Sequence, residues 1–334
     1  MRVLGIETSC DETAAAVVED GRRVLSNVVS SQVHLHRRYR GIVPELASRA
    51  HLQKIAPVIE AALDVAGGAP LDAVAYTRGP GLMGPLLVGK VAAQTLARLL
   101  GCPLLGINHL EGHIYAAELS GRLEFPLVAL IVSGGHTDLV LSPASGRFRV
   151  LGRTRDDAAG EAFDKVARML DLGYPGGPVV DRLAKEGDPA AVDFPRPHMP
   201  ETWDFSFAGL KTAVLYHLQR RGGERLKPAQ TRDLCASFQD AIVDTLVAKT
   251  LRAALRFRVR EVVLGGGVAA NSRLRERLAK ACLEKGLRVL MPPPALCTDN
   301  GAMIAQVATH LLRRGSPGRG LRCDPSLPFR NWGA

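Results

Sequence analysis

The sequence predicts an α/β protein in which two similar lobes follow one another along the chain. A strand–turn–strand pattern at residues 2–20 returns at residues 126–143. A strand that runs into a glycine-rich turn and a helix at residues 73–90 returns at residues 260–271. Repetition of both patterns, in a chain of 334 residues, is typical of a duplicated fold.

The first lobe is expected to begin with a β-meander. The apolar run RVLGIE (2–7) is followed by AAAVVED (14–20) and RRVLSNVVSS (22–31), which have the composition of strands. Pro44 stands near the start of a long helical pattern, in which Pro57 is expected to introduce a kink. A strand, a glycine turn and a helix come next, and then a further strand that ends just before a pair of histidines.

The second lobe is expected to repeat this order with additional helices. Helices are predicted for residues 156–172 and 228–256, and a late strand for residues 287–292. We expect an N-terminal lobe at residues 1–122 and a C-terminal lobe at residues 123–315, with the two lobes facing a cleft. An irregular, proline-rich insertion is expected around residues 187–208, and a C-terminal tail at residues 316–334.

Composition limits the classes of partner and compartment. The net charge is +10, and basic clusters occur at residues 34–41, 256–261 and 313–322. This surplus fits either a polyanionic partner such as nucleic acid or a solvated, arginine-rich surface. The six cysteines form no C-x-x-C pair, which is typical of reduced thiols in a cytoplasmic protein. No apolar run reaches the roughly 18 residues of a membrane span, so no membrane association is expected.

A pair of histidines, His109 and His113, opens the helix that follows the strand at residues 103–108. Four residues apart on a helix, the two imidazoles share a face and can bind one cation. In the zinc-protease pattern H-E-x-x-H, the glutamate directly follows the first histidine. Here Leu110 occupies that position, and Glu111 lies about 100° further round the helix. The spacing therefore argues against a protease, and leaves a metal site and an ordinary helix start both open.

Three loops have the composition of ligand-binding turns. IVSGGHT (131–137) contains two glycines, whose missing Cβ atoms let backbone N–H groups approach a phosphate or carboxylate. GGGVAAN (265–271) leads into a helix, and Asn271 either caps that helix or binds a ligand hydroxyl. The N-terminal loop carries Asp11 and Glu12, which suit a metal or an amine. Each loop alone also fits a plain tight turn. Their recurrence in both lobes predicts a nucleotide in the cleft, although no P-loop motif is present.

The segment CTDNGAMIA (297–305) places Asp299 at a turn before a helix. If the two lobes face one cleft, Asp299 can reach His109 and His113. Two histidines and one carboxylate suit iron(II) or zinc and leave coordination positions open. The alternative is that Asp299 caps the following helix, and the sequence leaves both interpretations open.

These motifs together resemble one family from end to end, that of the tRNA N6-adenosine threonylcarbamoyltransferases. The resemblance rests on GIETSCDETA, SQVHLHRRYRGIVPELASRAH, YTRGPGLMGPLLVG, NHLEGHIYA, LIVSGGHT, DDAAGEAFDKVARMLDLGYPGGP, DFSFAGLKTA, GGGVAANSRLR and CTDNGAMIA. It implies the duplicated actin-like fold shared with Hsp70 and sugar kinases, also called ASKHA or ribonuclease H-like. The tail after about Gly315 and the stretch at 187–203 match the family poorly.

The resemblance also implies roles for particular residues. His109, His113 and Asp299 match the ligands of one divalent metal, Fe²⁺ in the first place and Zn²⁺ as the alternative. Asp11 and Glu12 match acidic residues near the reacting centre. The residues that match the threonylcarbamoyl-adenylate site are Ile131, Val132, Ser133, Gly134, Gly135, Asp164, Gly177, Asp181 and Asn271.

The activity implied by the resemblance is acyl transfer. The threonylcarbamoyl group of threonylcarbamoyl-AMP passes to N6 of an adenosine beside the anticodon, in the anticodon stem-loop of tRNAs that read ANN codons. The implied partners are tRNA, a paralogue of the same fold and a small P-loop ATPase. Two rival functions remain open. A metal-independent small-molecule kinase or ATPase would explain the fold but not the metal-ligand set, and a non-catalytic scaffold would tolerate loss of Asp11.

Overall fold

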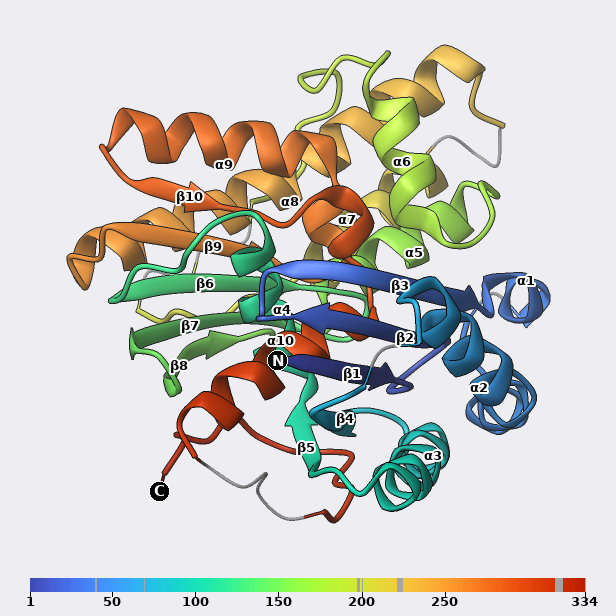
Figure 1. Ribbon diagram of the computed structural model, residues 1–334. Helices are drawn as coiled ribbons and strands as arrows, with labels where there is room; N and C mark the ends of the chain where they lie inside the picture. The colour runs from blue at the N-terminus through green and yellow to red at the C-terminus, as the bar shows by residue number, and fades with distance from the viewer. Residues whose placement is uncertain are drawn as a thin grey trace. The chain divides into compact units, whose positions relative to one another are not determined.

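The computed structural model describes residues 1–39, 41–68, 70–196, 199, 201–220, 225–315 and 321–333. The chain forms two compact units, which are drawn together in Figure 1. Unit 1 comprises Met1–Leu123 and Ala295–Ala334, and unit 2 comprises Glu124–Pro294. No helix in the described ranges is long and apolar enough to span a membrane.

Unit 1 is built on a five-stranded mixed sheet with the order β3-β2-β1-β4-β5. The first three strands form the predicted antiparallel meander, and β4 and β5 add to β1 in parallel. The strands are β1 (Arg2–Glu7), β2 (Glu12–Glu19), β3 (Arg23–Ser31), β4 (Ala73–Gly79) and β5 (Leu104–Asn108).

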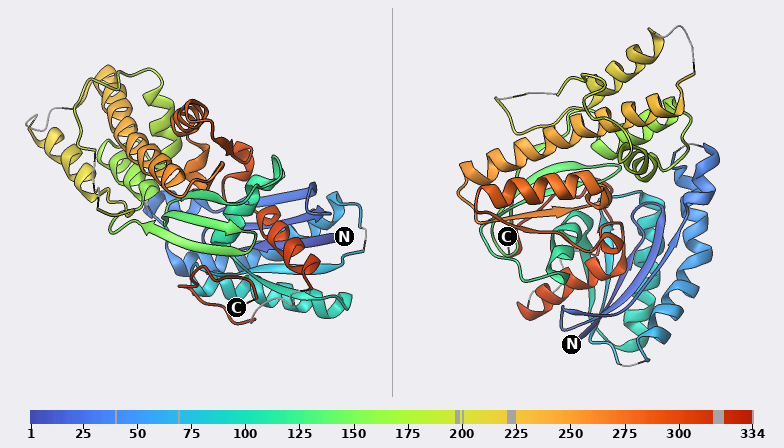
Figure 2. Two further views of the ribbon diagram at one scale, coloured as in Figure 1. Left: turned by 90° about the vertical axis from the view of Figure 1, so that its left-hand side faces the viewer. Right: turned by 90° about the horizontal axis from the view of Figure 1, so that it is seen from above.

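Helices cover both faces of this sheet. Leu4 and Ile6 alternate along β1 and pack, on one face, in a cluster with Ile55 of α2 and Leu86 of α3. The helix α10 packs on β1 and β2 from the opposite face, and also contacts α4 (Figure 2). The helices of unit 1 are α1 (Val33–His36), α2 (Pro44–Val65), α3 (Met83–Leu100), α4 (His109–Ala116) and α10 (Gly301–Arg313), and α2 continues through its internal Pro57.

The position of α10 corrects the expected division of the chain. Residues 295–315 were expected in the second lobe, but they belong to unit 1. A Cβ atom on Gly5 of β1 would lie 2.2 Å from the carbonyl oxygen of Gly301. Only glycine permits so close an approach, so α10 lies directly on the backbone of β1. Packing between segments this distant in sequence determines the unit, and periodicity cannot reveal it.

Unit 2 repeats the sheet of unit 1, with the order β10-β9-β6-β7-β8. Again an antiparallel meander, β6-β7-β8, is extended in parallel by the two later strands. The predicted duplication is therefore confirmed. The strands are β6 (Leu127–Val132), β7 (Thr137–Ala144), β8 (Arg147–Arg153), β9 (Glu261–Gly265) and β10 (Arg288–Leu290).

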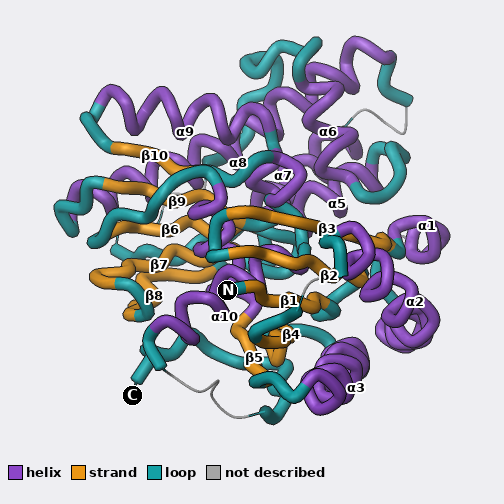
Figure 3. Tube along the Cα trace, viewed as in Figure 1, coloured by secondary structure: helices purple, strands orange, loops and turns teal. Residues whose placement is uncertain are grey.

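Among the described residues of unit 2, five α-helices accompany this second sheet, and Figure 3 distinguishes helices from strands. The long α8 is buried along most of its length and contacts α6, α9 and β6. The helices are α5 (Ala159–Met169), α6 (Gly176–Ala184), α7 (Ala208–Gln219), α8 (Pro228–Arg256) and α9 (Ser272–Glu284). The insertion expected around 187–208 is irregular over its described residues, while positions 197, 198 and 200 lie outside them. Phe205 forms an isolated bridge with Thr154.

The C-terminal segment of unit 1, residues 321–333, has no regular secondary structure but is firmly attached. Cys323, Leu327 and Trp332 are all at least nine-tenths buried. The rest of the expected tail, residues 316–320 and 334, lies outside the described part of the chain. We call residues 321–333 the C-terminal strap.

Candidate functional site

The histidine pair lies at the start of α4, as predicted. Asn108 ends β5, and its side-chain oxygen accepts hydrogen bonds from the backbone N–H groups of Leu110 (2.9 Å) and Glu111 (3.4 Å). This N-cap fixes the first turn of the helix, on which His109 stands. The rings of His109 and His113 lie edge to face with centroids 4.6 Å apart, and both side chains are buried.

Asp299 completes a three-residue group with the two histidines. Its Oδ1 atom lies 3.3 Å from Nε2 of His113 and 3.6 Å from Nε2 of His109. The alternative interpretation of Asp299 as a helix cap is wrong, because Asn300 caps α10 by accepting from the N–H of Met303 at 3.0 Å. Asp299 was expected to reach the histidines from the second lobe. All three residues instead belong to unit 1.

A buried carboxylate orients the first of these histidines. Glu7, at the end of β1, accepts a hydrogen bond from Nδ1 of His109 at 3.0 Å through its Oε2 atom. Thr77 donates to the same oxygen at 2.6 Å, and the N–H of Ser9 donates to Oε1 at 2.5 Å. With its proton on Nδ1, a neutral His109 would present the lone pair of Nε2 to a cation bound beside Asp299. A carboxylate behind a ligating histidine is a common feature of metal sites.

The second histidine supplies the test of whether a metal fits. Both ring nitrogens of His113 are buried and neither forms a hydrogen bond with a described residue, although Oδ1 of Asp299 lies 3.3 Å from Nε2. The ligand atoms of His109, His113 and Asp299 all lie within 4.8 Å of one another. A divalent cation between them would satisfy Nε2 of His113, so the residues fit a metal centre of two imidazoles and one carboxylate.

The electrostatics of this group favour a bound positive charge. Burial alone would disfavour a charged His109, but the carboxylates of Asp299 and Glu7 outweigh it and raise the pKa of His109 to about 9. Without a metal, a proton therefore occupies this position. A cation that binds here must displace that proton.

Glu111 does not act with the histidines. Its Oε2 atom accepts a hydrogen bond from Nε1 of Trp332 in the C-terminal strap, at 2.8 Å. The prediction that Glu111 faces away from the His109–His113 side of the helix is thus confirmed, which removes the general base that the zinc-protease pattern requires.

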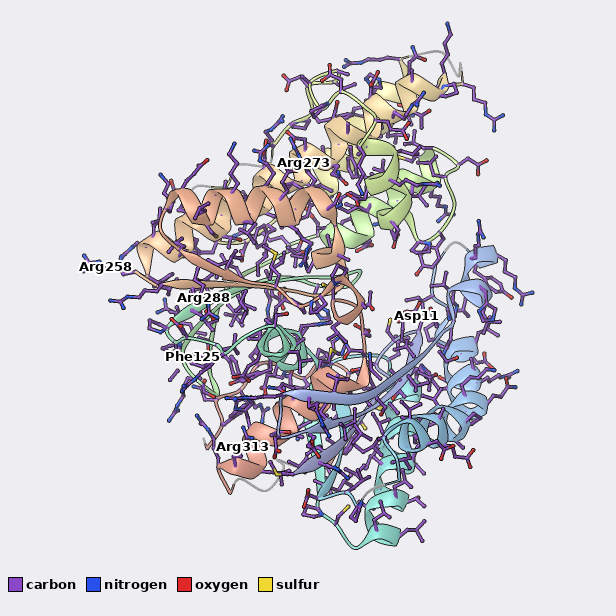
Figure 4. All side chains as sticks on the ribbon, turned by 45° about the horizontal axis from the view of Figure 1, so that its top comes forward. Asp11, Phe125, Arg258, Arg273, Arg288 and Arg313 are labelled. Atoms are coloured by element: carbon purple, nitrogen blue, oxygen red, sulfur yellow. The ribbon has the colours of Figure 1, made fainter. Side chains whose placement is uncertain are left out.

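Asp11 and Glu12 lie at the turn between β1 and β2, and Figure 4 labels Asp11. Glu12 accepts a hydrogen bond from Oγ of Ser31 at 3.1 Å. Burial, together with the neighbouring charges of Asp11 and Asp299, raises the pKa of Glu12 to about 10. Since Asp299 contributes to this shift, the two acidic residues lie within electrostatic reach of the candidate metal group. A cation bound to Asp299 would lower the pKa of Glu12.

In unit 2, the glycine loop between β6 and β7 is a tight turn with an open tip. The N–H of Ser133 donates to the carbonyl of His136 at 2.8 Å, and the N–H of His136 donates to Oγ of Ser133 at 3.1 Å. Gly134 and Gly135 are exposed, and a Cβ on either would meet nothing within 4 Å. The loop therefore leaves space for a ligand to approach its backbone.

The remaining residues predicted for substrate binding make contacts within unit 2. The side chains of Ile131 and Val132 are fully buried in β6, so only their backbone is available to a ligand. Gly177, in the first turn of α6, has open space beside it. Asp164 accepts from the N–H of Gly176 at 2.7 Å, which fixes the start of the same helix.

Asn271 and Asp181 meet at the start of α9. The side chain of Asn271 caps this helix by accepting from the N–H of Leu274 at 2.9 Å, and it donates to Gln239 at 2.7 Å. Asp181 of α6 accepts from Oγ of Ser272 at 2.9 Å. The capping role offered as one alternative for Asn271 is therefore present, while binding of a ligand by the same residue stays a prediction.

Sequence reasoning did not identify Glu7 or Trp332. A signal for Glu7 existed, because a carboxylate that directly ends an otherwise apolar strand must find partners in the interior. Trp332 gave no signal, because it belongs to a segment without periodicity.

Fold and site together define a class, namely an actin-like protein with a duplicated α/β sheet and a two-histidine, one-carboxylate group. HypF of T. kodakarensis superposes with a TM-score of 0.63 at 15% identity, over 94% of this chain and 48% of that protein. Component A of the Acidaminococcus fermentans (R)-2-hydroxyglutaryl-CoA dehydratase superposes with a TM-score of 0.54 at 16% identity, over 93% of this chain and 98% of that protein. At these identities the likeness shows the fold alone.

The family follows from sequence comparison. The TsaD family model, described as tRNA N6-adenosine threonylcarbamoyltransferase, matches residues 23–306. The protein of that name from Symbiobacterium thermophilum is 59% identical over 94% of this chain and 92% of its own length. The one from Anaeromyxobacter dehalogenans is 57% identical over 97% of this chain and 98% of its own length. The chain belongs to the tRNA N6-adenosine threonylcarbamoyltransferase family.

Proposed function

We propose that the chain transfers the threonylcarbamoyl group from threonylcarbamoyl-AMP to N6 of the adenosine on the 3′ side of the anticodon, in tRNAs that read ANN codons, with release of AMP. Family membership makes the chain an acyltransferase that modifies N6 of a tRNA adenosine. The observation that carries the proposal is the group of His109, His113 and Asp299. The rival function, a metal-independent kinase or ATPase of the same fold, has no use for these residues.

The reaction requires three things of the protein, namely activation of the electrophile, acceptance of a proton and binding of the donor. The N6 amine attacks the carbonyl carbon of the threonylcarbamoyl group, so a C–N bond forms and the C–O bond to the phosphate breaks. AMP leaves with the electron pair of that bond, and N6 loses one proton. Because an exocyclic adenine amine is a weak nucleophile, positioning and activation of the carbonyl must supply most of the rate.

Activation of the electrophile is the task we assign to the metal group. His109, His113 and Asp299 would hold one divalent cation, for which Fe²⁺ is our first proposal and Zn²⁺ the second. The cation supplies Lewis-acid chemistry, which polarises a carbonyl or phosphate oxygen. Glu7 keeps Nε2 of His109 available by accepting the hydrogen on Nδ1.

Proton transfer is the task we assign to the acidic turn. Glu12 is partly buried and its pKa is raised to about 10, so it would accept a proton only once a cation beside Asp299 favours its ionised form. Asp11 is adjacent in the sequence and shares a hydrogen bond with Glu12. The carboxylate pair can therefore take the N6 proton and pass it on.

Binding of the donor is the task we assign to unit 2. The N–H groups of Gly134 and Gly135 at the exposed tip of the turn suit the phosphate of an adenylate, and the free space beside Gly177 suits its flat base. Asn271, Asp181 and Asp164 supply amide and carboxylate groups that hydrogen-bond to nucleoside hydroxyls. Ile131 and Val132 would contribute through their backbone.

The acceptor we propose is the anticodon stem-loop of tRNA, where bases are unstacked and reachable. The net charge of +10 favours such a polyanion. The exposed Arg37 and Arg38 belong to the first basic cluster, in which Arg40 lies outside the described residues. A same-fold paralogue and a P-loop ATPase are proposed as protein partners on the family resemblance alone.

The experiment that tests this function is modification of an ANN-decoding tRNA by purified protein with threonylcarbamoyl-AMP, with and without the two helper proteins. Threonylcarbamoyladenosine is measured by mass spectrometry of the digested tRNA. We expect product with wild type, and a decrease of at least about 100-fold for Asp11→Ala and Glu12→Ala, which is the usual scale of acid–base catalysis.

Glu60→Ala on α2 is the matched control, since it removes an exposed carboxylate that does not belong to the turn. Melting temperature and metal content are measured beside activity. Asp11→Ala and Glu12→Ala variants that melt normally, bind metal and still modify tRNA at the wild-type rate would remove both residues from the mechanism. ATP-dependent phosphorylation of a small molecule, without any tRNA product, would favour the kinase alternative.

A further inference from the structure

The first half of the C-terminal strap runs along β4. Tyr76 donates its hydroxyl hydrogen to the carbonyl of Leu321 at 2.9 Å, and the N–H of Asp324 donates to the carbonyl of Arg78 at 2.9 Å. The N–H of Gly81 donates to the carbonyl of Pro325 at 3.1 Å. The strap is thus attached to the central sheet of unit 1 before it reaches α4.

The second half of the strap binds both ends of α4. At the start of the helix, Nδ2 of Asn108 donates to the carbonyl of Pro328 at 3.1 Å, while its Oδ1 atom caps the first turn. Further along, Nε1 of Trp332 donates to Glu111 at 2.8 Å. The indole also stacks on the ring of Tyr115, with centroids 5.3 Å apart and planes at 20°. Trp332 is only 7% exposed, so its contacts are made away from water.

Trp332 also touches α10, the helix that follows Asp299. The guanidinium of Arg314 lies 5.3 Å from the centre of the indole ring, and the imidazole of His310 lies 6.3 Å from it. His310 in turn packs against Tyr115 at 4.8 Å and contacts Glu118, just beyond α4. Trp332 therefore connects α4, which bears both histidines, with α10, which begins just after Asp299.

A helix as short as α4 depends on such contacts. The helix α4 runs from His109 to Ala116, which is eight residues or about two turns. Isolated helices of fewer than roughly 12 residues are only marginally stable in water. His109 is the first residue of the helix, and His113 follows one turn later. Both positions move if the helix axis tilts or its first turn frays, and metal affinity depends on ligand placement within a fraction of an ångström.

We propose that the C-terminal strap is a positioning element of the metal centre, and that Trp332 is the residue through which it acts. This inference rests on the metal role proposed for His109, His113 and Asp299. Trp332 touches no ligand. It holds Glu111 and Tyr115, which bracket His113 on the same helix, and so sets the helix that presents both imidazoles.

The test compares metal affinity with overall stability in full-length protein. Co²⁺ is titrated into metal-free protein and followed by visible absorption, and Zn²⁺ competition gives the second affinity. For Trp332→Ala we expect the dissociation constant of both ions to rise at least about 10-fold, the effect usual for residues that orient metal ligands. Hydrogen exchange in the metal-free protein should accelerate in α4 but not in β1 or β2.

Two further variants separate positioning from simple loss of an aromatic side chain. Trp332→Phe keeps the stack on Tyr115 but removes the donor to Glu111, so its affinity should lie between those of wild type and Trp332→Ala. Trp203→Ala removes the other tryptophan, which lies in unit 2 against Arg252. That variant should bind both ions as wild type does, whatever its melting temperature.

Three results would overturn the inference. The first is a Trp332→Ala protein that melts earlier but binds Co²⁺ and Zn²⁺ with wild-type affinity, since the strap would then be structural only. The second is an equal loss of affinity in Trp203→Ala. The third is a wild-type protein that binds neither ion, which would overturn the proposed metal centre as well, whereas the first two results leave that centre intact.

Discussion

Replacement of Glu7 by glutamine is the sharpest test of how the proposed metal centre is supported. The two side chains have nearly the same volume, so the packing at the end of β1 is preserved. The carboxylate, however, accepts hydrogen bonds from three donors, namely Ser9 N–H, the Thr77 hydroxyl and Nδ1 of His109. Glutamine has only one oxygen to offer them.

Both orientations of the new amide create a conflict. If the NH₂ group faces Ser9, two donors meet in the interior. If it faces His109, Nδ1 must become the acceptor and the proton moves to Nε2, the atom that faces Asp299 at 3.6 Å. A buried donor without an acceptor costs about 1–3 kcal/mol. Loss of a residue that orients a ligand costs about 10- to 100-fold in metal affinity, which corresponds to about 1.4–2.8 kcal/mol.

We therefore expect Glu7→Gln to bind Zn²⁺ about 10- to 100-fold more weakly than wild type, measured by competition against a chromophoric chelator. The comparison is made above pH 9, because the pKa of His109 is raised to about 9 and a proton competes with the metal below that. Thr77→Val is the matched control. It removes one donor to the same carboxylate but leaves the bond to His109, so stability should fall while affinity is kept. Wild-type affinity in Glu7→Gln would refute this account of the site.

Four other predictions follow from the described contacts. His113→Ala should retain less than about a tenth of the wild-type metal after purification, because a two-ligand site binds weakly; equal metal content by mass spectrometry would contradict the ligand role. Asn271→Ser keeps an oxygen to cap α9 but loses the buried bond to Gln239, so stability should fall by about 1–3 kcal/mol while AMP binding weakens in calorimetry; unchanged affinity would remove Asn271 from the donor site. The double variant Arg37→Glu, Arg38→Glu should weaken tRNA binding and reduce the slope of log K against log salt concentration by about 1–2. If neither the affinity nor this slope changes, the cluster is only a solvated surface. Asp138→Asn should stabilise the protein by roughly 3 kcal/mol at pH 8 and by about 0.5 kcal/mol or less at pH 4, as measured by denaturant unfolding.

The sign of the last prediction follows from the raised pKa. Burial raises the pKa of Asp138 to about 6, against the opposing charge of Arg153, whereas the unfolded chain has the ordinary value near 3.8. The folded state therefore prefers the protonated acid. The penalty for ionising it is absent below about pH 4 and complete above about pH 6, so asparagine is favoured only at the higher pH. An equal effect of the substitution at both pH values would contradict the assignment.

The parts of the fold that sequence reasoning predicted share one property, which is a local signal. The meander strands are short apolar runs, and the glycine turns at 131–137 and 265–271 mark the passage from strand to turn. Repetition of these signals was enough to predict the duplicated sheets. The return of α10 to unit 1 could not be predicted in the same way, because it depends on contact between Gly5 and Gly301, whose only local signature is a missing side chain.

The same distinction holds for the site. The spacing of His109 and His113 on one helix face is a local signal, and so is the acidic turn that contains Asp299. The orienting carboxylate of Glu7 looks locally like the last residue of a strand, and its role depends on the arrangement of three strands. Trp332 lies in a segment whose structure comes entirely from what it packs against, so no pattern in the sequence indicated that it would reach α4.

Because unit 1 is made of two separate segments of the chain, it cannot be completed during synthesis until unit 2 has been made. Unit 2 is one continuous stretch, Glu124–Pro294, and every strand of its sheet is available before the last part of the chain is made. Unit 1 must wait, since the face of β1 that α10 covers stays open until Gly301–Arg313 have been made. Asp299 arrives at that same late stage. A chain that stops after Pro294 can complete unit 2 but lacks Asp299 and the strap, so the proposed metal centre can form only after the sheet of unit 2 has been made.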